Sequence, residues 1–125
     1  MRKDIFEGQM YKKHLIWILC FLLVACKEKM PKLPSDILQP DAMVQILADM
    51  SIADAVAETK AQAGMSEEQL TKGYYEMIYK TRGITAEQFN KSMKYYDEQP
   101  HWINKIYDEV QQELSKLEAT ISQGK

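Results

Sequence analysis

Apolar residues recur every three or four positions through most of the chain beyond residue 40, which is the spacing of one face of an α-helix. The pattern predicts four helices, and no segment alternates as a strand would. Pro40 and Asp41 favour the start of the first helix, because proline suits the first helical position and acidic residues suit the first turn. This helix is predicted to end near Gly64, and its apolar stripe consists of Met43, Ile46, Leu47, Met50, Ala53 and Ala57.

Two capping motifs predict the second and third helices. Ser66-Glu67-Glu68-Gln69 and Thr85-Ala86-Glu87-Gln88 each place a hydroxyl residue three positions before a glutamine, which is the pattern of a capping box. Gly83 between them is suited to end the second helix, since glycine readily adopts the left-handed conformation at a helix end. The predicted core residues are Leu70, Tyr74, Met77 and Ile78 in the second helix and Phe89, Met93 and Tyr96 in the third.

The last helix is predicted to start at Pro100, and its apolar side chains alternate in steps of four and three residues. This heptad spacing suits packing against another helix. The heptad pattern is short for an independent coiled coil, so it favours a helix bundle formed within the chain. The predicted fold is therefore all-α, a small bundle of four helices over residues 40–122 whose second and third helices form a hairpin, with a tail at 123–125. The apolar positions of the last helix are Ile103, Tyr107, Val110, Leu114, Leu117 and Ile121.

The N-terminal segment has the organisation of a targeting signal. Lys12 and Lys13 precede an uncharged apolar run from Leu15 to Ala25. The run is too short to span about 30 Å of hydrocarbon as a helix, but it has the length of a signal-peptide core. Residues 1–25 are therefore predicted to be a signal peptide. A chain starting at Met10 would have the usual short basic head, so Met10 is an alternative start.

The predicted signal ends in Leu23-Val24-Ala25-Cys26, which resembles the lipobox of bacterial lipoproteins. The resemblance implies that the Cys26 thiol receives a diacylglyceryl group and that the chain is cleaved between Ala25 and Cys26. An N-acyl chain such as palmitate would follow. The alternative is an apolar helix end that happens to finish in Ala-Cys. Two or three acyl chains suffice for stable anchoring, whereas one binds a membrane only marginally.

The residues after Cys26 predict a destination and a tether. By resemblance to lipoprotein sorting signals, Lys27 in place of an aspartate argues against retention in an inner membrane. We therefore expect the outer membrane, with the periplasmic and surface leaflets both open. Pro31 and Pro34 favour extended backbone, so residues 26–39 are predicted to be a lipidated tether that reaches at most roughly 40 Å.

Composition narrows the functional classes. The chain has 16 Lys and Arg against 18 Asp and Glu, a net charge of −2, and so lacks the basic footprint of a nucleic-acid-binding protein. Cys20 would leave with the signal peptide, so Cys26 would have no partner for a disulfide or a cysteine-based zinc site. His101, the one histidine beyond the signal, is expected at a helix surface. No nucleotide-binding or hydrolase motif occurs. We therefore predict no catalytic residues, no metal, no cofactor other than the lipid, and no enzymatic activity.

One carboxylate falls at an unusual place in the helical pattern. On a helical wheel Asp54 lies between Leu47 and Ala57, inside the apolar stripe of the first helix. This position predicts a buried carboxylate, which needs a hydrogen-bonding partner. A tyrosine hydroxyl, Arg82 or a helix N-terminus could supply it, and contact with a ligand is the alternative.

Three tyrosines lie off the predicted core stripes, namely Tyr75, Tyr79 and Tyr95. Aromatic side chains outside a core are enriched at binding surfaces, so these residues are the candidates for contact with a partner. The alternative is that neighbouring helices cover the second helix on two sides.

The chain also resembles a family of bacterial lipoproteins, the domain of unknown function 4296 family. The likeness rests on LVAC, on PSDILQPDAMVQILADMSIADA and on YYEMIYKTRGITAEQFNKSMKYYDEQPHWINKIYDEV. It implies a small helical envelope lipoprotein and transfers no activity or site residues. A weaker likeness over residues 74–114 connects Gly83-Ile84-Thr85 and the helices around it with the helical peptide-binding domain of periplasmic foldases of the SurA type.

Two functional hypotheses follow from location, shape and resemblance. The first is a non-enzymatic structural or adaptor lipoprotein, held to the membrane by its lipid, that binds another envelope protein. The alternative is a chaperone-like module that binds unfolded peptides. A contiguous exposed apolar groove would favour the chaperone, and a flat mixed surface would favour the adaptor.

Overall fold

A computed structural model describes residues 32–124 of the chain. The chain divides into two units, Met1–Lys32 and Leu33–Lys125, and all four described helices belong to the second. No strand occurs among residues 32–124, so the prediction of an all-α fold with four helices is confirmed. The helices are α2 (Pro40–Ala61), α3 (Glu67–Arg82), α4 (Ala86–Asp97) and α5 (Pro100–Gln123).

The local signals in the sequence act at the helix ends as predicted. The hydroxyl of Ser66 accepts a hydrogen bond from the backbone N–H of Gln69, and that of Thr85 accepts one from Gln88. Gly83 ends α3 in the left-handed conformation with φ 67°. Pro40 and Pro100 open α2 and α5, where a proline costs no helical hydrogen bond.

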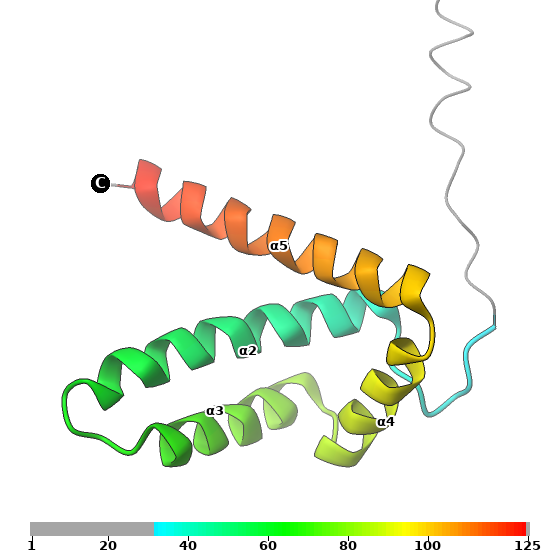
Figure 1. Cartoon of the computed structure of the whole chain (residues 1–125), viewed down its shortest axis with the longest axis horizontal. Helices are drawn as coiled ribbons and strands as arrows, with labels where there is room; N and C mark the ends of the chain where they lie inside the picture. Colours follow the sequence, from blue (N-terminus) through cyan, green and yellow to red (C-terminus); the bar gives the residue numbers. More distant parts are fainter. Residues whose placement is uncertain (1–31, 125) are drawn as a thin grey trace, which may run out of the picture. The chain divides into compact units, whose positions relative to one another are not determined.

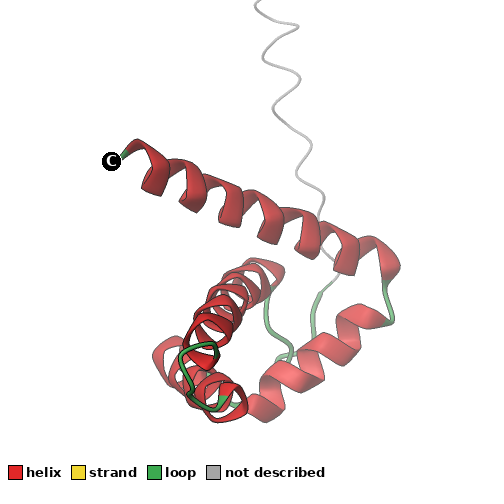
Figure 2. Cartoon of the chain, turned by 60° about the vertical axis from the view of Figure 1, so that its left-hand side comes forward, coloured by secondary structure: helices red, strands yellow, loops and turns green. Residues whose placement is uncertain are grey.

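Helix α2 is the centre of the folded unit, because it packs against both α3 and α5 (Figure 1). In the turned view of Figure 2, α4 runs from the α2–α3 pair to the start of α5. The turn at Gly83 joins α3 to α4 as expected for the predicted hairpin, but α3 packs chiefly along α2. An ion pair between Arg82 and Asp49, with a shortest distance of 2.6 Å, also joins these two helices.

The core lies between α2 and the first half of α5, where α4 closes one end. Ile106 and Val110 of α5 are only 1% and 3% exposed. Tyr96 of α4 and Phe89 are also buried. From α2 the core receives the buried apolar side chains Met43, Val44, Ile46, Ala48, Met50, Ala53 and Ala57.

Several predicted core positions prove to be exposed. Met77 on α3 is 57% exposed, and Tyr107, Leu117 and Ile121 on α5 are 47%, 43% and 60% exposed. Periodicity identifies an apolar stripe but does not say how much of the stripe a neighbouring helix covers. In both views α5 leaves the side of α2 toward its C-terminal end, so the last turns of its stripe lie uncovered (Figures 1 and 2).

The folded unit begins before the boundary predicted at residue 40. Ile37 and Leu38 are buried. The backbone N–H of Leu38 donates to the Ser92 hydroxyl at 2.9 Å, and the Tyr96 hydroxyl donates to the Leu38 carbonyl at 2.7 Å. The last residues of the expected tether are thus attached to α4, because two large apolar side chains are more stable in the core than in water.

A surface ion pair reinforces this attachment. Asp36 accepts a hydrogen bond from the Lys91 ammonium on α4. The contact lowers the pKa of Asp36 and raises that of Lys91. The lysine therefore links the entering segment to the same helix as Ser92 and Tyr96.

Candidate interaction surfaces

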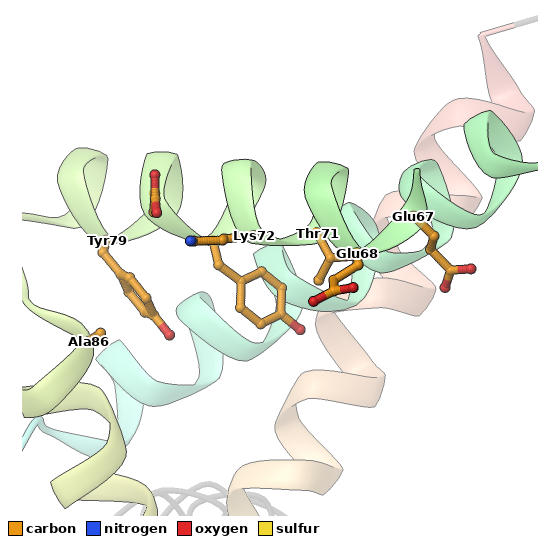
Figure 3. A pocket seen from close by; sticks show the side chains of 8 residues that line it. Glu67, Glu68, Thr71, Lys72, Tyr79 and Ala86 are labelled. Carbon is orange, nitrogen blue, oxygen red and sulfur yellow. The ribbon is translucent and has the colours of Figure 1, made fainter. Parts of the chain in front are cut away.

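An open groove of about 770 Å³ runs along one side of α3. Figure 3 shows Thr71 and Tyr79 projecting from the same side of the helix, with Ala86 of α4 beside Tyr79. We call it the tyrosine groove, and its lining residues are Glu67, Glu68, Thr71, Lys72, Tyr75, Glu76, Tyr79 and Ala86.

Two of the three predicted partner-binding tyrosines meet in this groove. The rings of Tyr75 and Tyr79 are in edge contact, with centroids 6.5 Å apart, and Tyr79 contacts Phe89 of α4 at 5.7 Å. Both side chains are half-buried. Burial raises the pKa of Tyr79. Tyr79 is therefore held by α4 on one side, Tyr75 lies against Tyr79, and both line the open groove.

Asp54 holds the Tyr75 ring in place. The Tyr75 hydroxyl donates a hydrogen bond of 3.0 Å to the Asp54 carboxylate on α2. Burial, and after it this hydrogen bond, raises the pKa of Tyr75 to about 12. The prediction that Asp54 is buried is wrong, because its residue is exposed. The predicted kind of partner, a tyrosine hydroxyl, is the one present, while Arg82 pairs with Asp49 instead.

The rim of the tyrosine groove is acidic. Glu67, Glu68 and Glu76 line it, and Lys72 is the one cation among the lining residues. All four are exposed. The acidic residues in the first turn of α3 also favour the helix itself, because they lie near its positive end. A groove with aromatic walls and an excess of carboxylates suits a cationic side chain with an apolar stem.

The remaining candidates lie elsewhere. Tyr95 on α4 is half-buried, contacts Tyr96 edge-on at 5.4 Å, and does not line the tyrosine groove. His101 is exposed in the first turn of α5, next to Trp102. Ala25 and Cys26, the predicted cleavage and lipidation site, lie outside the described residues.

Sequence reasoning missed a second open surface, between α2 and the C-terminal half of α5. This α2–α5 groove measures about 660 Å³, and its apolar walls are Ile52 and Val56 on α2 and Leu114, Leu117 and Ile121 on α5. A smaller groove of about 350 Å³ lies across the same ridge of Ile52 and Val56, against Tyr74 and Met77 of α3. The sequence did contain a sign of this surface, because Ile52 and Val56 are four residues apart and so form a second apolar stripe on the first helix.

Two further kinds of feature, a cluster of metal ligands and a membrane-spanning helix, are absent from residues 32–124. Residues 32–124 contain no group of three or more His, Cys, Asp or Glu side chains placed to hold a metal ion. Within the same residues, no helix has both the length and the apolar character needed to cross a bilayer.

Fold and surfaces together define the class of protein, a small all-α unit with open grooves on two sides of its central helix pair. A family model described as "Domain of unknown function (DUF4296)" matches residues 34–120, and the chain belongs to this family. The match begins at Pro34, in agreement with the early start of the folded unit. No curated protein matches the chain, and no solved structure does either.

Proposed function

We propose that the chain is a lipid-anchored protein of the bacterial cell envelope that binds another envelope protein or peptide without catalysing a reaction. The observation that carries the binding role is the tyrosine groove, in which Tyr75 and Tyr79 are fixed by the fold and still open to solvent. Aromatic rings held in place in this way lose little side-chain entropy on binding and provide large contact areas.

The charge of the groove favours a basic segment as the bound element. Three glutamates and one lysine line the rim, so a lysine or arginine of the partner could lay its stem on the tyrosine rings and its charge among the carboxylates. Rim charges act mainly on the rate and specificity of association. Binding is therefore expected to weaken as the salt concentration rises.

The anchor rests on the lipobox resemblance of Leu23-Val24-Ala25-Cys26. Because the folded unit begins at Leu33, the stretch from Cys26 reaches at most about 25 Å when fully extended. A lipid on Cys26 in the outer membrane would then keep the start of the folded unit, which carries the tyrosine groove, within that distance of the membrane, where it could meet an envelope partner.

The test is site-specific photocrosslinking in intact cells of the full chain. A photoreactive side chain at Tyr79 is expected to crosslink a defined partner, while one at Lys80, exposed and outside the groove lining, serves as the matched control. Glu76→Lys, an exposed change outside the first turn of α3, should strongly weaken the crosslink from Tyr79 while changing the melting temperature little, because exposed substitutions usually alter stability by under about 0.5 kcal/mol. Equal crosslinking from both positions, or no effect of the charge reversal, would refute the role of the groove.

A chaperone-like role is the second candidate, and the apolar groove against α3 favours it. Ile52, Val56 and Met77 line that groove, and methionine adapts its shape to varied apolar side chains. An unfolded apolar peptide should then bind with an affinity that Met77→Lys reduces and that the groove charge reversal does not. Measured by fluorescence anisotropy, a peptide affinity untouched by Met77→Lys would remove this candidate.

A further inference from the structure

The exposed large apolar side chains of residues 32–124 gather on one face. Four of the seven line the α2–α5 groove, namely Ile52, Val56, Leu117 and Ile121. Soluble proteins rarely leave a contiguous apolar patch in water unless a partner covers it. This face is separate from the tyrosine groove, since the two share no lining residue.

The exposed C-terminal part of α5 continues a helix-packing seam that the rest of the fold covers at Val110. The heptad positions run from Ile103 to Ile121. Tyr107 is 47% exposed and Val110 only 3%, and beyond Val110 the exposure rises to 43% at Leu117 and 60% at Ile121. Side chains at heptad spacing pack best against another helix. The uncovered turns therefore present a seam ready for a second helix.

The opposite wall of the groove permits a close approach. On α2, Ser51, Ala55 and Thr59 recur every four residues beside the ridge of Ile52 and Val56, and all five line the groove. Small side chains between large ones form a channel into which the ridge of another helix can settle. A helix lying there would contact α2 and α5 together.

Charge along α5 distinguishes between orientations of a second copy of the same helix. With Leu114 and Leu117 as core positions, Glu113 and Glu118 occupy the flanking positions. A parallel pair would bring Glu113 of one copy beside Glu118 of the other, and like charges repel. An antiparallel pair centred between Leu114 and Leu117 would instead place Glu118 beside Gln111 and Glu113 beside Thr120, with no like charges in contact.

We propose that a second copy of this chain occupies the α2–α5 groove, with the two α5 helices antiparallel and Leu114 of each copy against Leu117 of the other. The paired α2 and α5 helices of the two copies form a four-helix bundle that covers Ile52, Val56 and Ile121. The proposal needs neither the lipid anchor nor the tyrosine groove.

The test is cysteine crosslinking of the full chain in extracts of the cells that express it, which does not depend on where the chain is located. Two differently tagged copies are co-expressed, one with Gln111→Cys and one with Glu118→Cys, both at exposed positions. In the antiparallel pair these sites lie about 3 Å apart along the helix axis, and in a parallel pair about 10 Å. Disulfides need Cα atoms within about 7 Å. We expect a mixed disulfide-linked dimer on mild oxidation, above the background of the chain without introduced cysteine.

A single Ile121→Cys variant reports the opposite orientation. In a parallel pair the two introduced thiols would be level, whereas in the antiparallel pair they lie about 16 Å apart along the axis. The proposal expects no dimer from this variant. A disulfide-linked dimer of Ile121→Cys without the mixed dimer would overturn the proposal. If neither dimer forms, the proposal is also overturned, and the groove binds a partner other than a second copy.

A charge placed in the seam supplies the matched control. Leu117→Lys should lower the yield of the mixed dimer by about tenfold or more, because the ammonium would be buried at the pair's centre. Ser115→Lys adds the same charge two residues away, at an exposed position outside the groove lining, and should leave the yield unchanged. Equal yields from the two variants would also contradict the proposal.

Discussion

At the scale of single residues, the structure depends on a few polar contacts that join segments distant in sequence. Tyr96 is completely buried and donates its hydroxyl proton to the Leu38 carbonyl, 58 residues away in the chain. Ser92 uses its hydroxyl twice, as acceptor from Leu38 and as donor to the Gln88 carbonyl. No helical pattern predicts these pairs, because they depend on how the entering segment lies across α4.

Removing the Tyr96 hydroxyl should therefore destabilise the fold. Tyr96→Phe leaves the buried Leu38 carbonyl without this donor, which costs about 1–3 kcal/mol. Chemical denaturation of the full chain measures the loss. Tyr95→Phe, one residue away and half-buried, is the control and should change stability by under about 0.5 kcal/mol. A loss as large at Tyr95 would show that the hydrogen bond is not the cause.

Tyr75 predicts a dependence of stability on alkaline pH. Burial and the hydrogen bond to Asp54 raise its pKa to about 12 in the folded chain, against about 10 when unfolded. The fold thus favours the neutral phenol, and this stabilisation is present in full below about pH 10 and is lost as the pH rises toward 12.

Tyr75→Phe removes this titration, so stability should fall less steeply over that pH range than in the unmodified chain. Unfolding by urea at a series of pH values provides the measurement, with Tyr107→Phe at an exposed position as the control. Parallel curves for the Tyr75 variant and the unmodified chain would contradict the assignment.

At the scale of secondary-structure elements, caps and turns define where each helix starts and stops. Gly83 has φ 67°, a conformation that costs a residue with a Cβ atom about 1–2 kcal/mol. Gly73 lies inside α3, where an added Cβ would meet no atom within 4 Å. The two glycines of one helix thus have opposite requirements.

Alanine at the two positions should act in opposite directions. Gly83→Ala is expected to destabilise the chain by about 1 kcal/mol or more. Gly73→Ala should stabilise it by about 0.5–1 kcal/mol, because alanine is a better helix former and nothing obstructs the methyl group. Melting temperatures of both variants check the pair. A shift in the same direction would mean that backbone conformation does not distinguish them.

At the scale of the whole molecule, the entering segment belongs to the folded unit. Ile37 and Leu38 are buried against the helices, so any tether to a lipid at Cys26 is shorter than the composition of residues 26–39 suggests. A short tether would limit how far the tyrosine groove can move from the membrane. The proposed function therefore depends on whether Cys26 carries lipid.

If the proposed lipid anchor exists, Cys26→Ser should abolish lipidation and leave unprocessed precursor, because the lipobox resemblance assigns the diacylglyceryl group to this thiol. Metabolic labelling with a fatty-acid analogue measures this, with Cys20→Ser as the control that should retain the label. Label that persists on the Cys26 variant would refute the lipid anchor.

The sequence by itself determined the fold class, the four helices of residues 32–124 and most of their ends. These features follow from interactions within a few residues, such as the Ser66 and Thr85 caps, the Gly83 stop and the three-and-four spacing of apolar positions. The sequence also identified Tyr75 and Tyr79 as candidates for contact with a partner, because the spacing of apolar residues shows that both lie off the core stripe of their helix.

Only the tertiary structure decided which stripes are covered. Met77, Leu117 and Ile121 have the pattern of core residues and lie in water, while Ile37 and Leu38 looked like tether and lie in the core. Burial of an apolar side chain depends on the angle between neighbouring helices and on where a distant segment settles. Both depend on contacts between residues far apart in the sequence. For the same reason Asp54, which the helical pattern predicted to be buried, is exposed and accepts the hydrogen bond that fixes Tyr75 in the tyrosine groove.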